Sequence, residues 1–225
     1  MPELGLRQRI YQMGLAFCAL FMSQAVPAQP HPAARPAPQL VLAYGDSLMA
    51  GYQLAPGQGF APQLEQALKA RGRNVKVVGA GVSGDTSTQG RARLNWVLAG
   101  LKQAPDLVVL ELGANDMLRG QPPATAKANL DAMVKAFKAK GSRVLVAGMR
   151  ANPTLGKTYV SAFEALYPAV AKANQVALYP FFLDGVAAQP GLLLADGMHP
   201  NPKGVQVIVK RILPAVEQAL DAKTE

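Results

Sequence analysis

The stretch LVLAYGDSL, residues 40–48, decides the fold of this 225-residue chain. It begins with a short apolar run, Leu40 to Tyr44, and continues into a glycine, a carboxylate and a serine. Similar apolar runs recur at 75–78, 107–112, 144–147 and 176–179. Apolar runs of this length, bounded by turn-forming residues, predict buried β-strands.

Between these runs, apolar residues recur at spacings of three and four, which predicts amphipathic helices. The helical patterns cover 60–68, 94–101, 130–137 and 205–220. Because strands that alternate with helices are joined by right-handed parallel crossovers, the expected fold is a three-layer α/β/α sandwich with a five-stranded parallel sheet. In such a sheet the active site lies at the carboxyl ends of the strands.

The first 28 residues have the pattern of a secretory signal peptide. Arg7 and Arg9 precede an apolar segment of ten residues, 13–22, and small residues close the pattern at 26–28. A membrane anchor is the alternative, but a bilayer span needs roughly 20 apolar residues. Residues 29–38 are proline-rich and predict an extended tether. We therefore expect a periplasmic or secreted protein whose folded domain covers 39–225.

Composition excludes several kinds of chemistry. The net charge is +9, but the basic residues are scattered and only 6% of residues are aromatic, so we expect no nucleic-acid partner. Transient contact with anionic lipid surfaces is the expected consequence of this charge. The only cysteine, Cys18, lies in the predicted signal peptide, so the mature chain has neither a disulfide nor a cysteine-based metal site. The size favours a monomer.

Polar clusters that packing does not require follow three of the predicted strands, at 45–47, 79–87 and 113–116. A fourth cluster, 196–200, precedes the last predicted helix. Because the carboxyl ends of parallel strands share one edge of the sheet, the first three clusters are expected to meet there. The fourth can fold back to the same edge.

Ser47 follows a strand and precedes a helix, where its hydroxyl could act as a nucleophile. The alternative is that Ser47 only caps the helix. Asp196 and His199 are three residues apart, a spacing that lets a carboxylate hold one ring nitrogen while the other faces a serine hydroxyl. The alternative is a plain surface turn.

An oxyanion hole needs N–H donors aimed at a developing negative charge. The side chain of Asn115 and the backbone N–H groups of Gly84 and Ser47 are the candidates. Alternatively, Asn115 belongs to an ordinary turn, and Gly84 is needed only for a positive φ angle.

Four blocks in this order and spacing resemble the SGNH (GDSL) hydrolase superfamily over residues 39–221. They are Tyr44-Gly45-Asp46-Ser47-Leu48, Ser83-Gly84-Asp85-Thr86, Gly113-Ala114-Asn115-Asp116 and Asp196-Gly197-Met198-His199-Pro200. The flanking residues resemble most the bacterial periplasmic acyl-CoA thioesterase, arylesterase and lysophospholipase branch. These flanks include Gly51-Tyr52, Leu118-Arg119-Gly120 and Pro180-Phe181-Phe182.

The resemblance implies a flavodoxin-like SGNH fold and a serine esterase or thioesterase. Ser47 would be the nucleophile, His199 the base and Asp196 the residue that orients the base. The backbone N–H groups of Ser47 and Gly84 and the side chain of Asn115 would form the oxyanion hole. The substrates would be small acyl esters or thioesters, such as aryl esters, acyl-CoA and lysophospholipids. The resemblance implies no metal and no organic cofactor.

Three other interpretations stay open. Residues 79–84 match the dinucleotide motif G-x-G-x-x-G, but no apolar helix follows at once and no strand ending in an acidic residue follows about 20 positions later. A carbohydrate O-deacetylase of the same superfamily is the second. The third is a non-catalytic lipid-binding module, which predicts a missing catalytic group, and none is missing. The apolar loop 149–159 weighs against the deacetylase if it covers an acyl groove, where Leu155 is a candidate lining residue.

Overall fold

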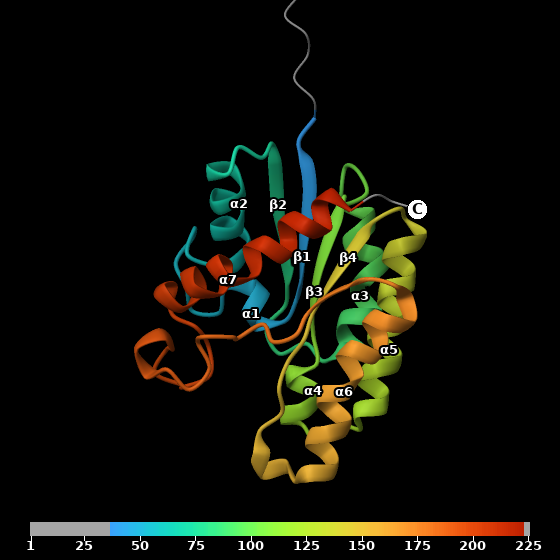
Figure 1. The fold of residues 1–225 in the computed structure, drawn as a ribbon, viewed down its shortest axis with the longest axis vertical. Helices are drawn as coiled ribbons and strands as arrows, with labels where there is room; N and C mark the ends of the chain where they lie inside the picture. Colours follow the sequence, from blue (N-terminus) through green and yellow to red (C-terminus); the bar gives the residue numbers. More distant parts are fainter. Residues whose placement is uncertain (1–36, 223–225) are drawn as a thin grey trace, which may run out of the picture. The chain divides into compact units, whose positions relative to one another are not determined.

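The computed structural model describes residues 37–222 (Figure 1). The predicted signal peptide, 1–28, and residues 29–36 of the predicted tether lie outside the described residues.

One parallel sheet forms the centre of the described domain. Its five strands follow the order β2-β1-β3-β4-β5, and all four pairings are parallel. The strands are β1 (Gln39–Gly45), β2 (Val75–Gly81), β3 (Leu107–Glu111), β4 (Arg143–Ala147) and β5 (Ala177–Tyr179). Each coincides with a predicted apolar run, and the predicted α/β fold with a five-stranded parallel sheet is confirmed.

Helices cover both faces of this sheet (Figure 1). On one face, α2 (Phe60–Ala70) packs against α7 (Pro202–Asp221). On the other, α5 (Pro123–Ala139) packs between α3 (Ser87–Ala99) and α6 (Lys157–Asn174). Two short helices, α1 (Ser47–Ala50) and α4 (Ala114–Leu118), follow β1 and β3 directly. Single 3-10 turns lie at Pro153–Leu155 and Pro190–Leu192.

The apolar pattern of the sequence did not predict α6, although this helix is one of the three in its layer. Its inward face carries Phe163, Leu166, Tyr167 and Val170, which are buried and recur at helical spacing. Pro168 lies inside the helix and hides the pattern, since proline normally interrupts helices. Tertiary packing of the apolar face outweighs that local preference.

The central strands form the core because both of their faces are covered. Val41 to Tyr44 in β1 and Leu107 to Leu110 in β3 have no exposed surface. This explains why these strands read as continuous apolar runs rather than as alternating patterns. Phe137 of α5 packs edge-on against Tyr44, with the ring centroids 5.4 Å apart. Each large side chain buried in this way contributes roughly 1.5–3 kcal/mol.

The loops at the carboxyl edge of the sheet approach one another closely at Gly81. A side chain at this position would collide with the backbone of Ala50 and would lie 2.6 Å from the backbone oxygen of Asp46. Glycine therefore lets the end of β2 contact the turn that follows β1.

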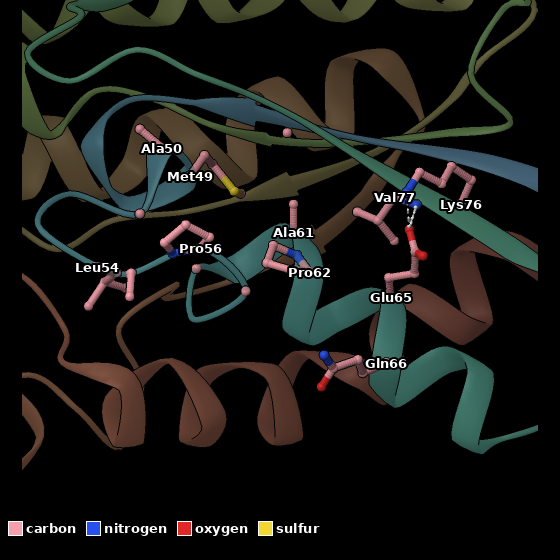
Figure 2. A pocket seen from close by; sticks show the side chains of 15 residues that line it. Met49, Ala50, Leu54, Pro56, Ala61, Pro62, Glu65, Gln66, Lys76 and Val77 are labelled. Carbon is pink, nitrogen blue, oxygen red and sulfur yellow. Dashed lines mark hydrogen bonds and ion pairs between the residues drawn. The ribbon is translucent and has the colours of Figure 1, made fainter.

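A cavity of about 480 Å³ lies between α2, β2 and the segment that begins with α1 (Figure 2). Glu65 reaches from α2 to β2, where one carboxylate oxygen accepts a hydrogen bond from the Val77 N–H at 2.8 Å and lies 3.2 Å from the Lys76 ammonium. The other oxygen lies 2.5 Å from the Lys69 ammonium. Burial alone would raise the pKa of Glu65, but these three partners outweigh burial and lower the pKa to about 2.

We expect Glu65→Gln to destabilise the domain by about 1 to 2 kcal/mol at neutral pH. This loss is smaller than the full pKa shift of Glu65 implies, because Lys69 and Lys76 are more than half exposed and their charges are screened by solvent. Because the pKa of Glu65 is lower in the folded state, its carboxylate stabilises the folded domain at pH values above 4.5, the ordinary pKa of glutamate. This stabilisation is lost as the pH falls towards 2. Thermal unfolding at both ends of this range measures it.

Glu164→Gln is the matched control, because Glu164 is exposed on α6. It should leave the unfolding midpoint unchanged. An equal loss of stability at neutral and at acid pH in Glu65→Gln would contradict an electrostatic role for this carboxylate.

Candidate active site

The turn after β1 presents Ser47 with a free hydroxyl. The residue that caps α1 is Asp46, whose Oδ1 accepts a hydrogen bond from the Leu48 N–H at 3.0 Å. Because Asp46 performs the capping, Ser47 occupies the first helical position and its side chain is not needed there. The Ser47 Oγ instead lies 2.8 Å from the Nε2 of His199. This geometry argues against the alternative that Ser47 is only a helix cap.

His199 is held on its other side by Asp196. The Nδ1 of His199 lies 2.7 Å from the Asp196 Oδ2. Since an ionised carboxylate can only accept, this contact assigns the ring proton to Nδ1 and leaves Nε2 as the acceptor for the Ser47 hydroxyl. The backbone N–H groups of His199 and Met198 donate to the Asp196 Oδ1 at 3.0 and 2.9 Å. These two bonds, followed by the imidazole, lower the pKa of Asp196 to about 2.

The loop that carries His199 is anchored at both ends. Leu193 pairs with Pro200 in an isolated antiparallel bridge. Asn201 then caps α7, and its side chain also donates to the backbone oxygen of Gly191 at 3.0 Å. The ring of Tyr52 packs over the imidazole, with the centroids 4.4 Å apart. The imidazole is therefore confined between the anchored loop and the segment after α1.

The three predicted oxyanion-hole groups lie on the same edge. Gly84 has a φ of +85°, and its backbone oxygen accepts from the Arg119 guanidinium at 2.7 Å. The Asn115 Nδ2 lies 3.0 Å from the Asp46 Oδ2 and 3.1 Å from the backbone oxygen of Asp85. Both N–H groups of the Asn115 amide thus have acceptors within the protein.

A cavity of about 760 Å³ opens over these groups. Ser47, Gly84, Asn115 and His199 line one part of it. The rest is mainly apolar and includes Leu48, Tyr52, Met117, Leu118, Met149, Pro153, Phe181, Leu183, Leu193 and Met198. The loop 149–153 contributes to this wall as expected, but Leu155 does not line the cavity. Leu155 ends the 3-10 turn that begins at Pro153, and its side chain is 40% exposed.

Sequence reasoning missed Arg93 of α3, which ties two of the polar blocks together. Its Nε lies 2.6 Å from the Asp85 Oδ2, and its Nη2 donates to the backbone oxygen of Gly45 at 2.8 Å. The guanidinium also lies over the Tyr44 ring, 4.3 Å from the centroid. An arginine within a helical pattern carries no signal for such contacts, because they depend on how α3 packs against β1.

Within residues 37–222 no group of three or more His, Cys, Asp or Glu side chains is arranged to hold a metal ion. None of the helices in this part of the chain is long and apolar enough to cross a membrane.

A doubly covered parallel sheet, with a serine, a histidine and an aspartate in series at its carboxyl edge, is the architecture of SGNH hydrolases. The chain belongs to the GDSL-like Lipase/Acylhydrolase family, whose model matches residues 43–207. The resemblance predicted from the four blocks is thereby confirmed, and the protein is an ester hydrolase.

Known esterases and thioesterases resemble this chain in sequence and in structure. The chain is 42% identical to an arylesterase of Vibrio mimicus over 195 residues, which cover 87% of this chain and 90% of that protein. It is 37% identical to thioesterase 1/protease 1/lysophospholipase L1 of Escherichia coli K12 over 161 residues, which cover 72% and 75% of the two chains. The crystal structure of TesA superposes with a TM-score of 0.76 at 40% identity, covering 80% of this chain and 99% of the other.

Proposed function

We propose that the protein hydrolyses medium- and long-chain acyl esters and thioesters through an acyl-enzyme on Ser47. The observation that carries this proposal is the continuous series from the Ser47 Oγ to the His199 Nε2 and from the His199 Nδ1 to Asp196, at distances of 2.8 and 2.7 Å. This series opens into an apolar cavity of about 760 Å³.

In the proposed mechanism, the Ser47 Oγ attacks the acyl carbonyl carbon while the His199 Nε2 takes the hydroxyl proton. The carbonyl oxygen becomes an oxyanion. The imidazolium, stabilised by the ionised Asp196, then gives its proton to the departing alcohol or thiol as the bond to the carbonyl carbon breaks. Water attacks the acyl-enzyme with His199 again as the base, which releases the carboxylic acid and restores Ser47.

The N–H groups of Ser47 and Gly84 and the amide of Asn115 are the proposed donors to the oxyanion. Since Asp46 and Asp85 already accept from the Asn115 amide, one of these bonds must yield as the charge develops. The bond to the Asp85 backbone oxygen is the one expected to yield, because the carboxylate of Asp46 is the stronger acceptor.

The cavity supports a substrate with a substantial acyl chain over an acetyl group. Its lining is mainly apolar, and its volume lies in the range of sites that enclose a drug-sized ligand. This weighs against the carbohydrate O-deacetylase. The complete series of Ser47, His199 and Asp196 weighs against a non-catalytic lipid-binding module. Relatives named arylesterase and thioesterase 1/protease 1/lysophospholipase L1 support aryl esters, thioesters and lysophospholipids as the substrates to test.

We expect residues 29–225 to hydrolyse a p-nitrophenyl ester series with a maximum at medium or long acyl chains. Ser47→Ala and His199→Ala should each lower kcat by about 10⁴ or more, because each removes a group that the bond-forming step requires. Release of p-nitrophenol measures both effects, and Ser161→Ala, at an exposed position on α6, is the matched control.

A strict preference for acetyl esters would favour the carbohydrate O-deacetylase instead. Absence of serine-dependent hydrolysis at every chain length would favour the binding module.

Asn115→Ala should lower kcat by roughly 10²- to 10³-fold with little change in KM, since an oxyanion donor acts mainly in the transition state. Steady-state kinetics on the preferred p-nitrophenyl ester separate the two constants. A change confined to KM would contradict the assignment of Asn115 to the oxyanion hole.

We further infer that the protein is exported, acts as a monomer and contacts anionic lipid surfaces through the cavity mouth. Cleavage after Ala28 removes two arginines and one glutamate, so the mature chain keeps a net charge of +8. At the mouth, Tyr52, Leu118 and Met198 line the cavity yet are 37%, 60% and 52% exposed. Arg119 and Arg150 are exposed beside them, which suits an anionic surface.

The exported chain should begin at Gln29, run as a monomer in gel filtration, and sediment with anionic vesicles but not with neutral ones. The paired change Leu118→Ser and Met198→Ser should weaken sedimentation. Trp96→Ser is the control, because Trp96 is 79% exposed on α3 and does not line the cavity. Weaker sedimentation of the Trp96 variant alone would place the lipid contact on another surface.

A further inference from the structure

The carboxyl group of Glu111 is completely buried and makes no hydrogen bond of normal geometry with the described residues. The residue ends β3 and has no exposed surface, and neither of its side-chain oxygens has a hydrogen-bond partner among the described residues. An unpaired buried carboxylate costs several kcal/mol, so such a group normally holds a proton or is replaced by an apolar residue. The mechanism proposed above does not use this group.

Glu111 lies directly beneath the nucleophile turn. In the sheet register it is opposite Gly45, the last residue of β1. A side chain at Gly45 would lie 2.7 Å from one Glu111 carboxyl oxygen and would collide with the Glu111 backbone oxygen. Glycine at the end of β1 therefore leaves the space that the Glu111 carboxyl occupies.

The polar group beside Glu111 is Asp46, whose carboxyl is also completely buried. The Asp46 carboxyl accepts two hydrogen bonds. The Leu48 N–H donates to Oδ1 at 3.0 Å, and the Asn115 amide donates to Oδ2 at 3.0 Å. Two adjacent carboxylates cannot both remain ionised in a dry site, so the pair keeps one proton between them. Asp46 accepts two hydrogen bonds that stabilise its ionised form, whereas the only donor within residues 37–222 that faces Glu111 is the Asp46 backbone N–H, which makes no hydrogen bond of normal geometry to it. This difference assigns the proton to Glu111.

We propose that Glu111 is a positioning residue for the oxyanion hole: its protonated carboxyl donates to Asp46 and thereby keeps that carboxylate in place to hold the Asn115 amide. Glu111 touches neither the substrate nor the reacting atoms. It acts through Asp46 on one proposed oxyanion donor, and it keeps a second negative charge away from the place where the oxyanion develops.

The electrostatic environment agrees with this division of the proton. Burial, followed by the charge of Asp46, raises the pKa of Glu111 well above its ordinary value. Burial also raises the pKa of Asp46, but the Leu48 N–H, Glu111 and Asn115 oppose the effect and limit it to about 6. Asp46 is thus the member of the pair that ionises as the pH rises to neutrality, while Glu111 stays protonated.

Other titratable groups face the pair from neighbouring elements. They are Tyr167 of α6, Asp116 of α4, and His199 from the loop before α7. Tyr167 donates to the Leu112 backbone oxygen at 3.2 Å, and Asp116 accepts from the Ser87 hydroxyl at 2.6 Å. Neither supplies a donor to Glu111. The guanidinium of Arg93 approaches from α3 but is bonded to Asp85 and to the Gly45 backbone oxygen.

The kinetic test compares Glu111→Gln with Glu111→Met. Glutamine keeps an N–H donor for Asp46, so its kcat should stay within a few-fold of the parent value. Methionine fills the site without a donor, and its kcat should fall by about 10- to 100-fold at nearly constant KM, the loss expected for one hydrogen bond to a charged group. An unchanged kcat in Glu111→Met, or equal losses in both variants, would overturn the proposal.

A stability measurement keeps the proposal testable if Glu111→Met does not fold. A carboxyl whose folded-state pKa is raised contributes its full stability below its ordinary value of 4.5 and loses it as the pH rises towards the folded-state pKa. Glutamine does not titrate, so the unfolding midpoint of Glu111→Gln minus that of the parent should increase from pH 4.5 to neutral pH. A difference that does not change with pH would mean that Glu111 is ionised in the folded protein and would overturn the proposal.

Glu164→Gln is again the matched control and should change neither kcat nor the pH dependence of unfolding. The inference rests on the proposed function, but the two can fail separately. Hydrolysis that persists in Ser47→Ala would contradict the proposed function. The pH dependence of unfolding in Glu111→Gln would still show whether Glu111 is protonated in the folded protein. Activity that depends on Ser47 and is indifferent to Glu111→Met would remove only the positioning role.

Discussion

The buried carboxyl of Asp46 joins the two halves of the active-site edge. One oxygen caps α1, which leaves the Ser47 hydroxyl free for His199, and the other holds the amide of Asn115. Aspartate suits this position because it offers two acceptors on a short side chain. Asparagine would point a donor at one of the two N–H groups, and glutamate would be one methylene longer in a closely packed turn. The arrangement places a negative charge in a dry site, and Glu111 lies where that charge must be accommodated.

Around Asp46, polar contacts replace regular secondary structure. Arg93 links Asp85 to the end of β1, while Asp116 accepts from both the hydroxyl and the N–H of Ser87. Loops at the end of a sheet have few backbone partners, so side chains must satisfy the buried donors and acceptors. A hydrogen-bonded network of this kind is rigid, which suits an oxyanion hole that must be formed before the substrate arrives.

The imidazole reaches this edge by a different route. His199 lies far from Ser47 in sequence, on a loop anchored by the bridge between Leu193 and Pro200 and by the Asn201 cap of α7. Its distance from Ser47 therefore depends on the packing of α7 against α2 and the sheet. Substitutions that weaken this apolar interface would displace His199 without changing any of the proposed catalytic residues.

Much of the architecture could be predicted from local patterns. The five strands were visible because both faces of the sheet are buried, and the four polar blocks marked the ends of strands and the final loop. The helix α6 was missed because Pro168 interrupts its pattern, and the suggestion that Leu155 lines the groove was wrong. Glu111 drew no attention, since one carboxylate within an apolar run looks like the end of a strand.

The sequence by itself determined the α/β sandwich and the order in which its polar blocks meet, because hydrophobic periodicity and turn chemistry are local properties of the chain. Only the tertiary structure decided that Asp46 rather than Ser47 caps α1, that the amide of Asn115 is already occupied, and that the buried Glu111 carboxyl makes no hydrogen bond within the described part of the chain. The Asp46 cap is a local contact, but the bonds of the Asn115 amide and the burial of Glu111 arise from residues far apart in the chain. Burial and hydrogen-bond partners exist only after distant segments have packed, and they set the protonation of each carboxyl group.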